Sequence, residues 1–129
     1  MALRDPVDKN LQRMECRRFA MRCEAQMSSI ERADTLREIG RLATSIALPY
    51  SITDDYEARD ALRLVRLRAE DRARELIEEQ IQNFARAEHH HRAKLKRTML
   101  DAWTHLTGPL GHLRSWAHNK LVAAEQQIG

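Results

Sequence analysis

Residues 62–84 read LRLVRLRAEDRARELIEEQIQNF, and this stretch decides the fold class. Its main apolar residues recur every three or four positions, and charged residues fill most of the places between them. Such a period places the apolar side chains on one stripe of an α-helix, whereas a half-buried strand would alternate strictly. The stretch therefore predicts a long amphipathic helix. Its stripe consists of Leu62, Val65, Ala69, Ala73, Leu76, Ile77, Ile81 and Phe84.

The composition of the whole chain agrees with this pattern. The 129 residues include only 4 Gly and 3 Pro, too few for the frequent turns of an all-β protein. Hydrophobic residues make up 43% and charged residues 32%, which supports a folded core. We predict an all-α protein with one domain over residues 1–129, either a four- or five-helix bundle or an extended helical hairpin with one very long helix. The expected helices span residues 6–27, 29–48, 54–106 and 109–127.

Two helix boundaries stay open at this point. Ser28 followed by Glu31 fits a capping box that would start a second helix, although a continuous helix is a nearly equal alternative. A helix over residues 54–106 would be about 80 Å long, which exceeds the diameter of a compact domain of this size. That helix therefore either projects or breaks, and the polar run at 88–92 is the favoured break. Gly108 suits a C-terminal cap.

Several functions are disfavoured by what the sequence lacks. It has no apolar run typical of a secretory signal and none long enough to span a membrane. Phosphate-binding loops, nucleophile elbows and CxxC motifs do not occur. Cys16 and Cys23 lie about 10 Å apart on a helix, too far for a disulfide, so we interpret them as free, core-forming thiols. We predict a protein of a reducing intracellular compartment (the cytoplasm or the interior of an organelle) with no enzymatic activity, catalytic residue or cofactor.

The histidine run at residues 89–91 raises the question of a metal site. Neighbouring side chains on a helix point about 100° apart, so the three cannot converge on one ion. Helical zinc ligands are spaced by three or four residues. A metal-binding bundle is therefore a minor alternative, and no residue is assigned as a ligand. Tertiary contacts alone could assemble a site from Glu88, His91, Asp101 and His105.

The positive charge is unevenly distributed. The net charge is only +3, which is small for a dedicated nucleic-acid-binding protein. Residues 86–97 nevertheless carry a dense basic stretch that only Glu88 opposes, and such density suits a phosphate backbone or an acidic protein surface. The candidate residues for binding an anionic partner are Arg86, Arg92, Lys94, Lys96 and Arg97.

The two tryptophans and the long apolar stripes suggest a role in protein interaction. Trp103 and Trp116 could stack on bases, but tryptophans more often pack in a core or anchor a protein interface, so both are candidate interface anchors. The stripes exceed what a monomer of this length easily buries, which favours a homo-oligomer or a larger assembly. We predict a non-enzymatic helical interaction protein: an assembly subunit, adaptor or inhibitor that docks on a protein partner. The alternative is a nucleic-acid-binding regulator that uses residues 86–97.

Overall fold

The computed structural model describes residues 6–128, with side chains from residue 8 onward. Five α-helices and two short 3₁₀ helices (η1 and η2) form this part of the chain, and it contains no strand, so the predicted all-α fold is confirmed. The elements are α1 (Pro6–Arg32), α2 (Leu36–Thr44), η1 (Tyr50–Ile52), α3 (Tyr56–Arg86), α4 (His89–Trp103), η2 (Gly108–Leu110) and α5 (Leu113–Ile128).

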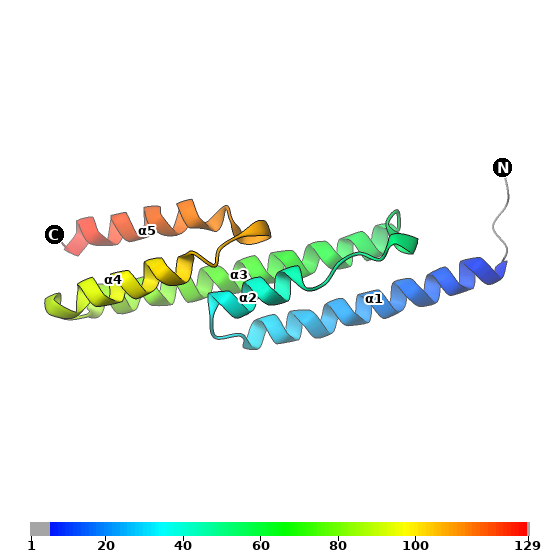
Figure 1. Ribbon diagram of the computed structural model, residues 1–129, viewed down its shortest axis with the longest axis horizontal. Coiled ribbons are helices and arrows are strands. Elements are labelled where there is room, and N and C mark those ends of the chain that lie inside the picture. Colours follow the sequence, from blue (N-terminus) through cyan, green and yellow to red (C-terminus); the bar gives the residue numbers. More distant parts are fainter. Residues whose placement is uncertain (1–5, 129) are drawn as a thin grey trace.

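The other four α-helices all pack against α3 in an elongated bundle (Figure 1). The 31 residues of α3 span about 46 Å. Helix α1 runs parallel to the first half of α3, and α2 returns antiparallel to both of them. Beyond the end of α1, α4 folds back along the second half of α3, and α5 turns again to pack on α3. Each end of α3 is thus covered by a different set of helices.

The junction at Ser28 is not a helix boundary, which corrects the expected 6–27 helix. Helix α1 continues to Arg32, and the Ser29 hydroxyl donates a hydrogen bond to the carbonyl of Ala25 within the helix (3.2 Å). The helix continues because Ile30, which is fully buried, adds another turn to the apolar face that packs on the core.

The capping box lies further along, at the start of α2. Thr35 is the N-cap, and its hydroxyl accepts a hydrogen bond from the backbone N–H of Glu38 (3.1 Å). This is the backbone-to-hydroxyl half of the capping box that the sequence analysis placed at Ser28. The expected 29–48 helix is therefore wrong at its N-terminal end, because the reversal of chain direction occurs between Arg32 and Leu36.

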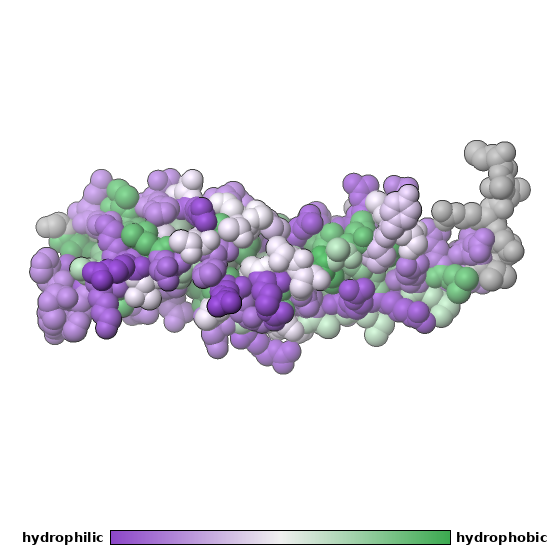
Figure 2. Space-filling model, viewed as in Figure 1, coloured by the Kyte–Doolittle hydropathy of each residue, from purple (hydrophilic) through white to green (hydrophobic). Residues whose placement is uncertain are grey.

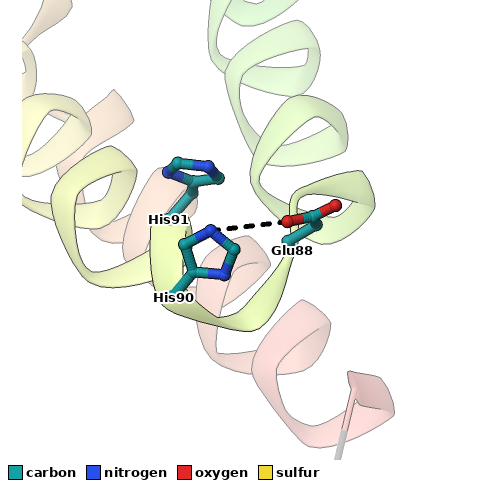
Figure 3. Close-up of side chains that lie close together, drawn as sticks. All are labelled: Glu88, His90 and His91. Carbon is teal, nitrogen blue, oxygen red and sulfur yellow. Dashed lines mark ion pairs between the residues drawn. The ribbon is translucent and has the colours of Figure 1, made fainter.

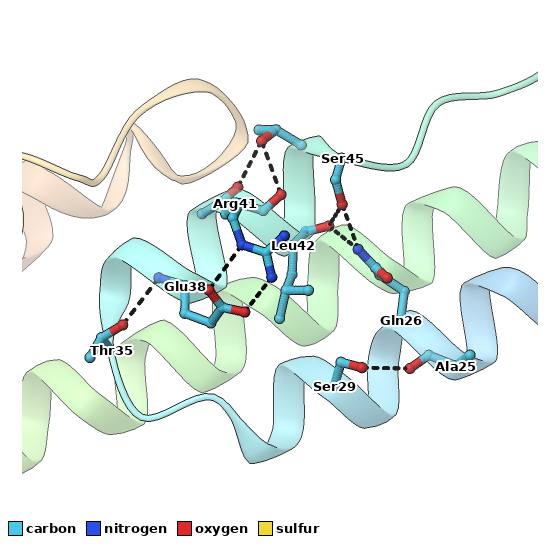
Figure 4. A network of polar contacts seen from close by, with 10 residues as sticks. Ala25, Gln26, Ser29, Thr35, Glu38, Arg41, Leu42 and Ser45 are labelled. Carbon is cyan, nitrogen blue, oxygen red and sulfur yellow. Dashed lines mark hydrogen bonds and ion pairs between the residues drawn. The ribbon is translucent and has the colours of Figure 1, made fainter.

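Helix α2 also ends earlier than expected, at Thr44, and α1 holds its C-terminal end. The side-chain amide of Gln26 donates to the carbonyl of Leu42 (2.6 Å) and to the Ser45 hydroxyl (2.7 Å), as Figure 4 shows. The last carbonyls of a helix have no partner within the helix, so a donor from a neighbouring helix stabilises the end. The chain then runs in extended form back toward the start of α3.

The long predicted helix breaks at residues 87–88, at the edge of the polar run where the break was favoured. The Arg92 guanidinium caps the end of α3 by donating to the carbonyls of Ala87 (3.1 Å) and Ala85 (3.4 Å). The break lets α4 fold back, and Trp103 then becomes buried in the core. Burial of the apolar face of α4 explains why the helix ends here without Gly or Pro.

The core is one contiguous cluster to which all five helices contribute. It is mainly aliphatic, and no polar or charged residue between residues 8 and 128 is buried. Cys23 is fully buried in this cluster, whereas Cys16 is partly buried against it. Both cysteines are free, as predicted.

The turn before α5 corrects the expected helix bounds at 106 and 109. Helix α4 ends at Trp103 with Thr104 as its C-cap, so Gly108 does not cap it, and α5 begins only at Leu113. The chain turns over these residues because the side chains of Leu106 and Leu110 are buried in the core. Gly108 adopts a φ of 55°, a left-handed conformation that costs little only for glycine. Pro109 follows in the first turn of η2, where the missing N–H is no loss.

The elongated shape leaves a large surface. The solvent-accessible area is 9144 Å², whereas a compact monomer of 15.0 kDa exposes about 7,000 Å². None of the helices within residues 6–128 has an apolar stretch long enough to cross a membrane.

Candidate functional site

Two of the five residues in the predicted basic site are engaged within the chain. The Arg92 guanidinium is half-buried against the last carbonyls of α3. The Lys96 ammonium pairs with the Glu125 carboxylate of α5 (2.9 Å). Both side chains hold α4 to its neighbours, so in this structure each cation is already engaged by an acceptor of the same chain.

The other three basic residues are exposed. Lys94 and Arg97 are three positions apart and share one side of α4, whereas Arg86 is the last residue of α3. His90 lies on the same side of α4 as Lys94, and the exposed Asp101 follows one turn after Arg97. The structure therefore presents a smaller positive surface than the sequence suggests.

Trp103 belongs to the core, which corrects its assignment as an interface anchor. Its side chain is only 1% exposed, and the indole N–H donates to the side-chain carbonyl oxygen of Gln80 (2.9 Å). The ring also meets the edge of His118 at a centroid distance of 5.3 Å. A side chain buried in this way between α3, α4 and α5 has no surface left for a partner.

Trp116 is only partly buried, so a contact with a partner remains a prediction for this residue. The Arg74 guanidinium and the Lys120 ammonium each lie 5.7 Å from the centre of its ring. Cations at this distance from an aromatic face are attracted to it, by about 0.5–1 kcal/mol at an exposed site.

A polar cluster beside Trp116 links α3 to the turn before α5. One carboxylate oxygen of Glu70 lies 2.7 Å from the Arg74 guanidinium and 2.9 Å from the His112 ring nitrogen Nε2. The hydrogen bond with His112, opposed by burial and assisted by Arg74, holds the pKa of Glu70 below its usual value. The cluster ties two segments together, but Glu70 remains an ionised acid rather than a proton donor near neutral pH.

The two thiols are poorly suited to nucleophilic chemistry. Burial raises the pKa of Cys23, and burial together with a hydrogen bond to Asp55 raises that of Cys16. The thiolate is the reactive form of cysteine, so a raised pKa lowers reactivity. Cys23 is therefore a small apolar side chain of the core, as predicted, whereas Cys16 is only partly buried and makes a hydrogen bond with Asp55.

The side of α1 that faces away from the core carries exposed apolar residues. Leu11 is 58% exposed, Met14 49% and Met21 67%. Figure 2 shows hydrophobic atoms among hydrophilic ones along the α1 end of the molecule. The spacing of three and then seven residues places Leu11, Met14 and Met21 on one side of α1, away from the side that buries Phe19 and Cys23. We call this side the α1 outer face; it also carries Arg18, Arg22 and Ala25.

A second exposed apolar pair lies on α3. Leu64 is 41% exposed and Leu67 42%. The same side of α3 continues with exposed acids one, two and three turns later, at Asp71, Glu75 and Glu78. We call this side the α3 outer face. Neither outer face was predicted from the sequence, because the dominant apolar stripes of both helices are those that pack inward.

Glu88, His90 and His91 come together at the start of α4 (Figure 3). One potential ligand atom from each lies within 4.8 Å of the others. The expectation that the three consecutive histidines cannot converge holds for His89, which is outside the group. It is too strict for His90 and His91, whose ring centres are 4.0 Å apart. Asp101 does not join this group among the described residues.

Comparisons with models of protein families, with curated protein sequences and with solved structures find no match to this chain.

Proposed function

We propose that this chain is a non-enzymatic assembly protein that associates with further copies of itself. The α1 outer face of one copy docks on the α3 outer face of the next. The observation that carries the proposal is the presence of two exposed stripes with matching patterns on different helices.

Four positions of the two stripes match when the helices are aligned in parallel, whereas Met21 falls opposite Arg74. Leu11 and Met14 on α1 have the same spacing as Leu64 and Leu67 on α3, so two apolar pairs can meet across the interface. In the same alignment Arg18 falls opposite Asp71. One turn further, Arg22 of α1 falls opposite Glu75 of α3, and opposite charges across an interface favour that register.

The acids of the α3 outer face already have partners on their own helix. Asp71 lies 3.9 Å from Arg74, and Glu75 lies 2.9 Å from Arg72. Because the side chains of both acids are exposed, each of these ion pairs contributes at most about 1 kcal/mol. Either acid can therefore change its partner at little cost in free energy. Both carboxylates are thus able to meet an arginine of the next copy.

The size of the surface also supports association. The chain exposes roughly 2,000 Å² more than a compact monomer of its mass, whereas a standard interface removes about 800 Å² from each partner. Because the two outer faces lie on different helices, the contact is heterologous and can repeat from copy to copy. The product would be a ring or a filament rather than a simple symmetric dimer.

Sedimentation velocity over a range of concentrations tests the proposal. The unmodified chain should increase in mass with concentration, and either Leu11→Glu with Met14→Glu or Leu64→Glu with Leu67→Glu should abolish that increase. A carboxylate placed in an apolar contact should weaken association at least tenfold, which corresponds to about 1.4 kcal/mol. Val122→Glu is the matched control, because Val122 is 50% exposed but lies on α5.

Mixing the two double variants makes the test specific. Each variant keeps one intact outer face, so the mixture should form dimers and stop there. A mixture that stays monomeric, or an unmodified chain that stays monomeric at about 100 μM, a concentration typical of weak association, contradicts the proposal. Equal loss of association in the Val122→Glu control would do so as well.

A further inference from the structure

The start of α4 gathers three side chains that ligate transition metals. Glu88 is the N-cap residue of α4, and its carboxylate makes no capping hydrogen bond with the helix. Instead it points toward His90, with 3.4 Å between the carboxylate oxygen Oε2 and the ring nitrogen Nε2 (Figure 3). The His91 ring lies beside that of His90, with the ring planes tilted by 43° and the ring centres 4.0 Å apart.

The position before the helix explains how consecutive residues converge. Glu88 has extended backbone angles (φ −64°, ψ 148°), so its side chain is not bound to the helical spacing that follows. It can therefore reach over the first turn of α4, where His90 and His91 lie. All three side chains are exposed, and they can reorient around an ion without disturbing the core.

Two imidazole nitrogens and one carboxylate oxygen are a donor set with a clear preference. Imidazole suits zinc, copper and nickel, whereas magnesium and calcium prefer oxygen ligands alone. Zinc binds such ligands at about 2.0–2.1 Å in a tetrahedron, so the ligand atoms would approach to roughly 3.4 Å of one another. The present separations within 4.8 Å need only side-chain rotation to reach this distance.

The charges nearby partly oppose a cation. The N-terminal end of a helix carries partial positive charge, and Arg92 is close in the chain. The Arg92 guanidinium, however, is directed to the carbonyls of Ala87 and Ala85 at the end of α3. The carboxylate of Glu88 supplies a negative charge at the site itself. The expected affinity is therefore modest, with a dissociation constant on the order of micromolar rather than that of a structural zinc site.

We propose that Glu88, His90 and His91 form a surface site for one divalent transition-metal ion, with zinc as the reference ion. Three protein ligands leave at least one coordination position for water or for a ligand from another molecule. The ion would bridge the N-cap residue and the first turn of α4, directly after the break from α3. This site is independent of the two outer faces on which the proposed assembly rests.

Isothermal titration of the full chain with zinc chloride at pH 7.5 tests the site. One ion should bind per chain, and Glu88→Gln, His90→Asn and His91→Asn should each weaken binding about tenfold or more. His89→Asn is the matched control, because His89 is exposed and adjacent but outside the group. It should change the affinity by less than twofold.

Three outcomes overturn the inference. The first is the absence of saturable zinc binding, and the second is binding that none of the three ligand replacements weakens. The third is an equal loss in His89→Asn, which would show that any histidine of the run serves.

Discussion

Replacement of Trp103 by alanine should destabilise the protein by about 4 kcal/mol. Removal of a buried tryptophan side chain typically costs 3–5 kcal/mol, and the side chain of Trp103 is 1% exposed. The hydrogen bond from its indole N–H to Gln80 contributes about 1 kcal/mol of that loss. A chain of this length has a total stability on the order of 10 kcal/mol, so this one change removes a large part of it.

A milder variant separates packing from hydrogen bonding. Trp103→Phe keeps an aromatic ring in the core but removes the indole N–H, and we expect a loss of about 1–2 kcal/mol. Combined with Gln80→Leu, it completes a double-mutant cycle. The cycle should give a coupling energy near 1 kcal/mol if the 2.9 Å hydrogen bond contributes to stability.

Urea unfolding followed by circular dichroism at 222 nm measures these differences. With a typical slope of about 2 kcal/mol per molar urea, Trp103→Ala should lower the midpoint by roughly 2 M. Trp116→Ala is the comparison, because that side chain is only partly buried, and its loss should be less than half as large. A loss below about 1 kcal/mol for Trp103→Ala would refute the burial of α4 against α3. It would also restore Trp103 as a candidate interface anchor.

Two further predictions concern charge. The lowered pKa of Glu70 stabilises the fold above the ordinary carboxyl value of 4.5, and this contribution is lost as the pH falls through the lower folded value. Between pH 7 and pH 2.5 the free energy of unfolding should therefore fall less in Glu70→Gln than in the unmodified chain, by a difference of up to about 1 kcal/mol. Thermal unfolding over this pH range measures the difference, and parallel curves for the two proteins would contradict the contact. Any binding of duplex DNA through residues 86–97 should lose affinity with salt at a logarithmic slope no steeper than about −3, since Arg86, Lys94 and Arg97 are the exposed residues among the five basic candidates. Fluorescence anisotropy at 50 and 200 mM salt measures the slope, and a value near −4.5 would show that Arg92 and Lys96 also reach the phosphates.

Much of the secondary structure could be predicted because it depends on neighbouring residues. The stripe through residues 62–84 has the helical period, and the structure has one helix there. Gly108 lies in a turn with a positive φ, which is a property of a single residue, but the helices on either side of it end and begin elsewhere than predicted. The capping box was sought at Ser28 instead of Thr35 because several short polar residues satisfy the local pattern equally well.

The candidate site could not be predicted to the same extent. The sequence shows five basic residues near one another, but whether a cation faces solvent depends on what folds beside it. Arg92 is used by the end of α3, and Lys96 is used by Glu125, which is 29 positions away in the chain. The group of Glu88, His90 and His91 forms because α4 starts at His89, and no Gly or Pro in the sequence marks that start.

The sequence by itself determined that the chain is helical and which side of each helix is apolar, because both follow from interactions within three or four positions. Only the tertiary structure decided where the longest helix breaks, which tryptophan is buried and which charges remain exposed. Those outcomes depend on contacts between distant segments, such as Trp103 with Gln80, whose energies exceed the small local preferences at a helix end. The matching outer faces of α1 and α3 likewise became visible only when the inward sides of both helices were known.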